Sequence, residues 1–364
     1  GCGETPYAKL ATQLYGDRMY IANATGCSSI WGGSAPSTPY TVDKKGHGPA
    51  WSNSLFEDNA EFGYGMMLAQ KQIRERLAND AQVLLDTPVA DKVQAWLDTY
   101  DDAAANTEAS DALIAALENT ELDGEANDAK VDFLRDKDYA AKKYQFIFGG
   151  DGWAYDIGFG GLDHVIANNE DVNILVVDTE VYSNTGGQSS KSSRTGSIAK
   201  FTASGKRQMK KDLASIAMSY GHVYVATVCH GANQNQVIKA LKEAEAYKGP
   251  SIVICYAPCI AHNIKGGLAK TQLEAKLATE CGYFPIFRFN PDLAKEGKNP
   301  FTMDSKAPDW SKYHDFLMNE GRYSQLSKIN PVKAEELLDL NLRDAQKRYE
   351  NYMARVNDPK YQDK

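Results

Sequence analysis

Residues 149–161 read G-G-D-G-W-A-Y-D-I-G-F-G-G, and residues 172–188 read V-N-I-L-V-V-D-T-E-V-Y-S-N-T-G-G-Q. Apolar, β-branched runs at residues 144–148 and 172–177 flank a helix-like segment. This order predicts a strand, a glycine-rich turn, a helix and a second strand, which together form a βαβ unit. Free backbone N–H groups and the helix dipole at such a turn favour phosphate, and glycine lets a ligand approach the backbone. The turn at residues 149–152 is therefore a candidate phosphate site.

An aspartate, Asp151, lies inside this turn. A carboxylate beside a pyrophosphate requires a cation between them, and Mg²⁺ binds through carboxylates, other oxygen ligands and substrate phosphates. Thr179 and the polar loop behind it follow the second strand, at the edge where open parallel sheets bind ligands. We therefore expect Asp151, Thr179 and the carbonyl of Val181 to hold a metal ion, with Asn184 one turn further along. The alternative is that the glycines only form a tight turn.

Length and composition indicate a globular protein. The chain has 364 residues, 43% of them hydrophobic, which suffices for a large core. A formal net charge of −8 argues against nucleic acid binding, and the basic residues at 206–211 fit a solvated helix face better. The sequence shows no signal peptide and no apolar run of the roughly 18 to 20 residues that cross a bilayer. We expect a soluble, cytoplasmic protein without nucleic acid or membrane partners. Because the sequence opens at Gly1 without Met, we also expect a piece of something longer.

Predicted strands and helices alternate along much of the chain. Further strands are predicted at residues 19–24, 222–229, 251–256 and 284–289, and helices at 211–220 and 233–247. The alternation predicts an α/β fold, a mostly parallel sheet with helices on both faces.

We assign residues 1–65 and 144–300 to this α/β domain. Residues 66–143 form a predicted helical insertion, either solvated helices packed on the sheet or a docking surface for a partner. Residues 301–364 form a C-terminal extension without strand signals, whose helix at 332–356 is expected to wrap the domain or a neighbouring subunit.

Two further segments leave alternatives open. Residues 46–65 could build a pocket wall or cap the helix that follows, with Asp58 or Asn59 as the N-cap, and scaffold is favoured over catalysis. Residues 186–205 form either a loop that closes over substrate or an ordinary mobile loop.

Three cysteines are predicted to lie at one edge of the sheet. Cys2 lies between two glycines, and Cys27 and Cys259 follow predicted strands. Thiolates from such loops can hold an iron–sulfur cluster, although no complete C-x-x-C is present and a terminal free thiol is the alternative for Cys2. Six cysteines in a chain of this size indicate reduced thiols or metal ligands, because disulfide frameworks are dense in small secreted domains. The remaining thiols, Cys229, Cys255 and Cys281, are interpreted as small buried residues.

These motifs resemble a known family. G-D-G followed about thirty residues later by Asn is similar to the diphosphate-binding motif of thiamine-diphosphate enzymes. Within these enzymes, D-T-E-V-Y-S-N-T-G-G-Q-S-S-K at residues 178–191 resembles pyruvate:ferredoxin (flavodoxin) oxidoreductase. The resemblance covers nearly the whole chain. Its other motifs are G-C-G-E-T-P-Y, N-A-T-G-C-S-S-I-W-G-G, F-E-D-N-A-E-F-G-Y-G, Y-A-P-C-I and G-K-N-P-F.

The resemblance implies a site with three cofactors. Mg²⁺ is held by Asp151, Thr179 and Val181, and a [4Fe–4S] cluster by Cys2, Cys27 and Cys259, with the fourth Cys upstream of Gly1. Asn184 is the implied catalytic residue, beside the thiazolium of thiamine diphosphate. The implied cofactor-binding residues are Glu4, Cys27, Gly150, Asp151, Gly152, Trp153, Thr179, Glu180, Val181, Tyr182, Ser183 and Asn184. One departure is Arg194, which stands where the family pattern has Pro.

The implied activity is the oxidative decarboxylation of pyruvate with coenzyme A to acetyl-CoA and CO₂. Electrons pass through the cluster to ferredoxin or flavodoxin, in a homodimeric enzyme of anaerobic metabolism. The chain carries no second α/β domain to supply the Glu that activates the aminopyrimidine, so we expect it to need the pyrimidine-binding domain. The alternatives are a cluster-free thiamine-diphosphate decarboxylase or carboligase, and a noncatalytic diphosphate-binding subunit.

Overall fold

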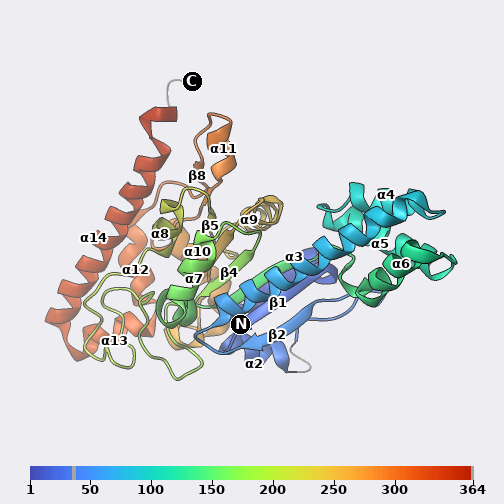
Figure 1. Cartoon of the computed structure of the whole chain (residues 1–364). Coiled ribbons are helices and arrows are strands. Elements are labelled where there is room, and N and C mark those ends of the chain that lie inside the picture. The colour runs from blue at the N-terminus through green and yellow to red at the C-terminus, as the bar shows by residue number, and fades with distance from the viewer. Residues whose placement is uncertain (35–37, 362–364) are drawn as a thin grey trace.

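A computed structural model of the chain describes residues 1–34 and 38–361, and one eight-stranded sheet runs through them. The strand order is β2-β1-β3-β4-β6-β5-β7-β8 (Figure 1). The six strands from β2 to β5 in this order are parallel, and the pairs β5–β7 and β7–β8 are antiparallel. The strands are β1 Met19–Ala24, β2 Ala50–Ser54, β3 Tyr144–Gly150, β4 Asn173–Asp178, β5 Tyr224–Val228, β6 Ser251–Tyr256, β7 Phe287–Phe289 and β8 Phe301–Met303. The prediction of an α/β fold with a mostly parallel sheet is confirmed.

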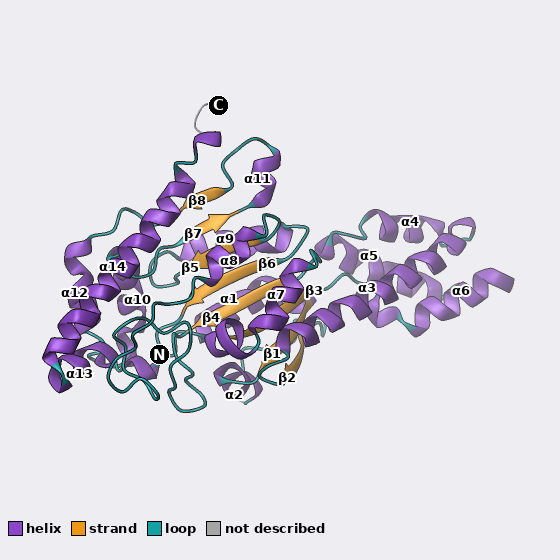
Figure 2. Cartoon of the chain, turned by 60° about the vertical axis from the view of Figure 1, so that its left-hand side comes forward, coloured by secondary structure: helices purple, strands orange, loops and turns teal. Residues whose placement is uncertain are grey.

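Helices cover both faces of the sheet (Figure 2). On β4, Ile174 and Val176 belong to one hydrophobic cluster and Leu175 and Val177 to another, because successive strand residues point to opposite faces. The helices of the first cluster are α3 Asn59–Val83, α7 Phe159–Ala167, α8 Leu213–Ser219, α10 Thr271–Glu280, α12 Tyr313–Met318, α13 Gly321–Ile329 and α14 Pro331–Val356. Those of the second are α1 Thr5–Tyr15 and α9 Gln234–Ala246. Burial on both faces accounts for the continuous apolar runs of the central strands.

A helical arm extends away from the sheet (Figure 1). The first part of α3 packs on β1, β3 and α7, and its later residues continue into the arm. There they meet α4 Ala90–Asp98, α5 Ala103–Glu118 and α6 Gly124–Arg135. The arm has its own core, which includes Leu77, Trp96, Leu113 and Phe133. The helical segment therefore begins at Asn59, seven residues before the predicted insertion, and only its later part leaves the sheet.

Three short elements differ from the expectations. α2 (Cys27–Gly33) is a helix in a segment for which no helix was predicted. β2 and β8 were not predicted, because A-W-S-N-S and F-T-M carry too few apolar residues to show a strand pattern, and each pairs with one neighbour at an edge of the sheet. Asp58 is the N-cap residue of α3, as one of the two candidates, but its side chain makes no capping hydrogen bond.

The C-terminal extension packs on the chain's own domain. α14 buries Leu337, Leu338 and Tyr352 in the first cluster, and the ring of Tyr352 lies 4.6 Å from that of Phe287. A short helix, α11 (Pro291–Lys295), connects β7 to β8. Among the described helices, none combines the length and the apolar character needed to cross a membrane.

Candidate functional site

The loops that follow β1, β3 and β4 enclose a small pocket at the carboxyl edge of the sheet. Parallel strands bring these loops together although they are far apart in the sequence. The pocket has a volume of about 40 Å³. It is lined by Glu4, Thr25, Gly26, Cys27, Ser28, Phe56, Gly150, Asp151, Gly152, Thr179, Val181, Tyr182, Ser183, Asn184 and Thr185. Most of the predicted site residues thus line one pocket.

Three oxygen atoms converge in this pocket. Oδ1 of Asp151 lies 2.8 Å from Oγ1 of Thr179, which lies 3.0 Å from the carbonyl oxygen of Val181. Adjacent oxygens of a Mg²⁺ octahedron are about 2.9 Å apart, since Mg–O distances are about 2.0 to 2.1 Å. The two spacings therefore fit neighbouring positions around Mg²⁺. The other carboxylate oxygen of Asp151 accepts a hydrogen bond from Oγ of Ser190 at 2.6 Å, which fixes the orientation of the carboxylate.

The electrostatics of this pocket favour a cation. Asp151 is only 1% exposed, and burial together with the nearby Asp178 raises its pKa to about 8. Burial also raises the pKa of Glu4 to about 7, despite the hydrogen bond that Nε1 of Trp31 donates to its carboxylate at 2.9 Å. A bound cation would offset the cost of two buried carboxylates at one edge of the sheet.

The glycines of the predicted phosphate turn have different roles. A methyl group at Gly149 would lie 2.6 Å from the ring of Trp153, and one at Gly152 would lie 2.6 Å from the ring of Tyr182. These two glycines are required by close packing of the protein. A methyl group at Gly150 would have only the carbonyl of Val177 near it, at 3.9 Å, so this glycine faces open space beside the pocket. The turn continues into a π-helix, Gly152–Ile157, before α7 begins.

Three cysteines lie at the same edge. The N–H of Gly3 donates to the carbonyl of Pro258 at 3.1 Å, and a methyl group at Gly3 would lie 2.6 Å from that oxygen. This contact places Cys2 beside the loop that carries Cys259. Burial is the main cause that raises the pKa of Cys2 to about 11 and that of Cys27 to about 12, and the nearby Glu4 and Cys259 contribute to both increases.

The thiols of Cys2, Cys27 and Cys259 do not form a complete metal-binding site by themselves. Across residues 1–34 and 38–361, no group of three or more His, Cys, Asp or Glu side chains is arranged to hold a metal ion. All six cysteines are free in the part of the chain that the structure describes. Cys229, Cys255 and Cys281 are fully buried in the hydrophobic clusters. Cys2, Cys27 and Cys259 are therefore set apart from the other thiols by their place at the pocket edge.

Glu180 and Trp153, both expected among the cofactor contacts, lie outside the pocket lining. The Trp153 side chain is buried in the first hydrophobic cluster. The Glu180 carboxylate lies 2.8 Å from Nε of Arg194, 2.9 Å from Nζ of Lys210 and 3.0 Å from Nη2 of Arg322. Burial alone would raise the pKa of Glu180, but these three cations hold it well below its usual range. The ion pairs of Glu180 thus stabilise the loop that follows β4, outside the pocket lining.

The loop at residues 186–205 is anchored in its middle part. Ser190, Ser192 and Arg194 are buried, and Nζ of Lys206 donates to the carbonyl of Ser190 at 2.8 Å. The Arg194 guanidinium lies 3.9 Å from the centre of the Tyr283 ring. The buried arginine therefore anchors the middle part of this loop to the protein interior.

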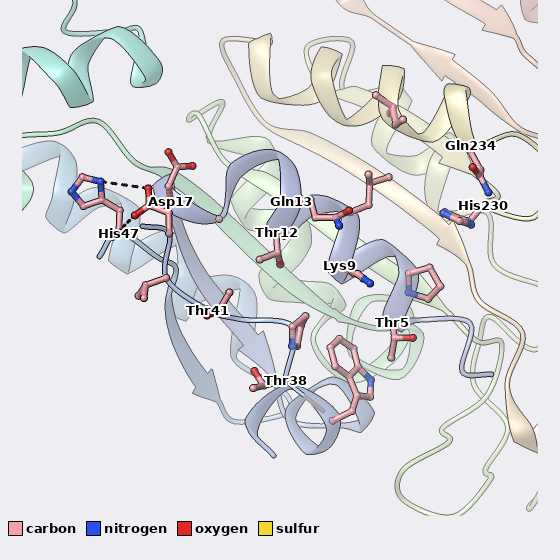
Figure 3. A pocket seen from close by; sticks show the side chains of 18 residues that line it. Thr5, Lys9, Thr12, Gln13, Asp17, Thr38, Thr41, His47, His230 and Gln234 are labelled. Carbon is pink, nitrogen blue, oxygen red and sulfur yellow. Dashed lines mark hydrogen bonds and ion pairs between the residues drawn. The ribbon is translucent and has the colours of Figure 1, made fainter. Parts of the chain in front are cut away.

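A second, larger groove lies beside α1 (Figure 3). Its volume is about 1020 Å³, and its lining includes Lys9, Thr12, His47 and His230. Figure 3 shows side chains of α1 along its length, with Asp17 and His47 near one end and His230 and Gln234 near the other. It contains none of the predicted site residues. Thr25, Ser28 and Phe56 of the first pocket were missed although they lie within two of the quoted motifs, because only Cys27 of these motifs was assigned a role at the site.

Several known proteins are similar to this chain in sequence. Residues 131–255 match the family described as thiamine pyrophosphate enzyme, C-terminal TPP binding domain. A pyruvate:ferredoxin oxidoreductase from Moorella thermoacetica is 57% identical over 358 residues, 97% of this chain and 30% of that protein. A pyruvate-flavodoxin oxidoreductase from Klebsiella pneumoniae is 54% identical over 356 residues, again 97% and 30%. A mitochondrial pyruvate dehydrogenase [NADP(+)] from Euglena gracilis is 48% identical over 367 residues, 98% and 19%.

Among solved structures, a 2-oxoglutarate:ferredoxin oxidoreductase from Magnetococcus marinus with 2-oxoglutarate, coenzyme A and succinyl-CoA bound covers 90% of this chain and 89% of its own, at 15% identity and a TM-score of 0.46. The chain spans about a third or less of the length of the three sequence relatives.

Proposed function

We propose that this chain is the segment of a larger enzyme that binds thiamine diphosphate and Mg²⁺. The premise is that the chain belongs to the pyruvate:ferredoxin and pyruvate-flavodoxin oxidoreductase family. The whole enzyme would convert pyruvate and coenzyme A to acetyl-CoA and CO₂, and would pass two electrons to ferredoxin or flavodoxin. The observation that carries the proposal is the oxygen triad of Asp151, Thr179 and Val181 beside Gly150.

The residues of the pocket divide the work of holding the cofactor. Asp151, Thr179 and the Val181 carbonyl would hold Mg²⁺, and the open space at Gly150 would admit the diphosphate. Bound thiamine diphosphate would supply the carbanion chemistry of 2-oxo acid decarboxylation. Asn184 is exposed at the rim of the pocket, where it would contact the reacting end of the cofactor as the catalytic residue. Tyr182, whose ring lies 5.7 Å from that of Phe56, would form a wall beside it.

The thiols at the same edge would carry electrons away. We assign Cys2, Cys27 and Cys259 as three ligands of a [4Fe–4S] cluster, on the strength of their shared position and the electrostatic effect of Cys259 on the pKa of Cys2 and Cys27. The fourth thiolate and the Glu that activates the cofactor would come from outside these residues. This chain alone would therefore be inactive. We further propose that the whole enzyme is a homodimer and that it is located in the cytoplasm.

The electron acceptor depends on other parts of the enzyme. This chain is 54% identical to a segment of a protein named for flavodoxin and 48% identical to a segment of one named for NADP⁺. Such similar segments in proteins named for different acceptors indicate that the acceptor site lies elsewhere. A substrate and acceptor panel on the whole enzyme would identify the pair.

Substitution of the central carboxylate tests the proposed cofactor site. In the whole enzyme, D151N should abolish calorimetric binding of Mg²⁺ with thiamine diphosphate and abolish pyruvate-dependent reduction of a low-potential acceptor. D163N is the matched control, because Asp163 lies on α7 and accepts a hydrogen bond from Tyr220 away from the pocket. Unchanged binding in D151N would contradict the assignment. Full activity of an iron-free enzyme would favour a cluster-free decarboxylase.

A further inference from the structure

Ser183 lies between the two halves of the proposed site. Its Oγ is 3.1 Å from Sγ of Cys259 and 3.2 Å from Oγ1 of Thr179. The loops that carry these residues follow β4 and β6, which are neighbours with Asp178 opposite Tyr256. A single hydroxyl thus touches a proposed cluster ligand and a proposed Mg²⁺ ligand.

The acceptors around Ser183 decide where its hydroxyl group donates a hydrogen bond. Its possible acceptors are Oγ1 of Thr179, the carbonyl of Val181 at 3.4 Å and Sγ of Cys259. A cation held by Thr179 and Val181 would engage lone pairs of both oxygens, which leaves them poorer acceptors. The sulfur of Cys259 is then the best remaining acceptor. A metal held by Thr179 and Val181 would therefore direct the Ser183 proton toward the thiolate.

A buried histidine holds the two loops at this spacing. Nε2 of His262 lies 2.6 Å from the carbonyl oxygen of Thr179, so this nitrogen carries a proton and donates. Nδ1 accepts from the N–H of Cys259 at 3.4 Å and lies 3.5 Å from a carboxylate oxygen of Glu320. His262 is fully buried. The contact between Ser183 and Cys259 therefore lies between two loops that a buried histidine joins.

We propose that Ser183 is a positioning residue that donates a hydrogen bond to Sγ of Cys259 and raises the reduction potential of the cluster held by that thiolate. The inference rests on the proposed function. A hydrogen bond to a cluster sulfur stabilises the additional negative charge of the reduced state more than that of the oxidised state. In the thiol itself, the contact with Ser183 opposes the rise in pKa that burial causes at Cys259.

The test is an EPR-monitored redox titration of the whole enzyme. C259A first identifies the relevant cluster as the signal that this substitution removes. S183A should shift the midpoint potential of that signal to a more negative value, and S183T, which keeps the hydroxyl, should stay near wild type. S189A is the matched control, because the structure shows no side-chain hydrogen bond from Ser189 to any described residue. An unchanged or more positive potential in S183A would overturn the inference.

Loading the cofactor site tests the direction of the proton. The potential gap between wild type and S183A should be wider with Mg²⁺ and thiamine diphosphate than after their removal with a chelator, since the coupling is reciprocal. Equal gaps would overturn the role of the metal. If C259A removes no signal, the cluster assignment fails instead, so the two failures are distinguishable.

Discussion

Gly150 provides the sharpest test of the phosphate turn, because the structure separates its role from those of its neighbours. An added methyl group would meet only the Val177 carbonyl at 3.9 Å, and its φ is not among the positive values. The protein should accept alanine, with a change in stability no greater than about 0.4 to 1 kcal/mol, in the stabilising direction. The methyl group would instead occupy space needed by the diphosphate.

The expected loss of affinity follows from the cost of forcing a methyl group into an occupied site. Overpacking costs about 1 to 3 kcal/mol. Since 1.4 kcal/mol corresponds to a factor of ten, G150A should weaken thiamine diphosphate binding roughly 5- to 150-fold. Isothermal titration calorimetry of the whole enzyme at saturating Mg²⁺ measures the affinity, and thermal unfolding in the same buffer measures stability.

Two other glycines complete the experiment. Gly160 has no atom within 4 Å of an added methyl group and lies in α7, so G160A should bind the cofactor like wild type. In G152A the methyl group would lie 2.6 Å from the Tyr182 ring, so both stability and binding should fall. Wild-type affinity in G150A would refute the view that this glycine admits the ligand, and would leave the tight turn as its only role.

Two further predictions concern buried carboxylates. E180Q leaves Arg194, Lys210 and Arg322 without their shared anion. Chemical denaturation should therefore show a loss of about 3 to 5 kcal/mol in the free energy of unfolding. The control is E336Q, at the exposed pair with Lys333, which should show almost no loss. Similar effects of the two substitutions would contradict the network. Because burial raises the folded-state pKa of Glu4 from 4.5 to about 7, stability present below pH 4.5 is lost as pH rises through 7. E4Q lacks this loss. The unfolding free energy of E4Q relative to wild type should therefore rise by about 3 kcal/mol as the pH rises over that range, and a pH-independent difference between the two proteins would contradict the prediction.

The core of the site could be predicted because its residues lie in one βαβ unit. Asp151 and Thr179 follow adjacent parallel strands, and strand ends meet at one edge of the sheet. Asp178 and Glu180 lie on either side of Thr179, and both pair with Nζ of Lys210 outside the pocket lining. Glu180 follows the end of β4 and has a positive φ of 57°, a backbone conformation that the motif does not reveal.

Other parts had no local signal. The cations around Glu180 come from positions 194, 210 and 322, and only the tertiary fold brings them together. Phe56 reaches the pocket from a loop after β2, a strand too polar to predict. The π-helix after Asp151 also follows no composition rule that separates it from an α-helix. Long-range ion pairs, edge strands and helix type therefore required the structure.

The separate core of the helical arm divides the chain into regions that can open independently. The arm cluster shares no residue with the two sheet clusters, and Arg74 closes it internally through the carbonyl of Tyr100 at 2.8 Å. Local unfolding of such a unit costs less free energy than opening the sheet. The arm can therefore unfold and refold locally while the strand ends keep their positions, so its amides should exchange hydrogen faster than those of β3 and β4.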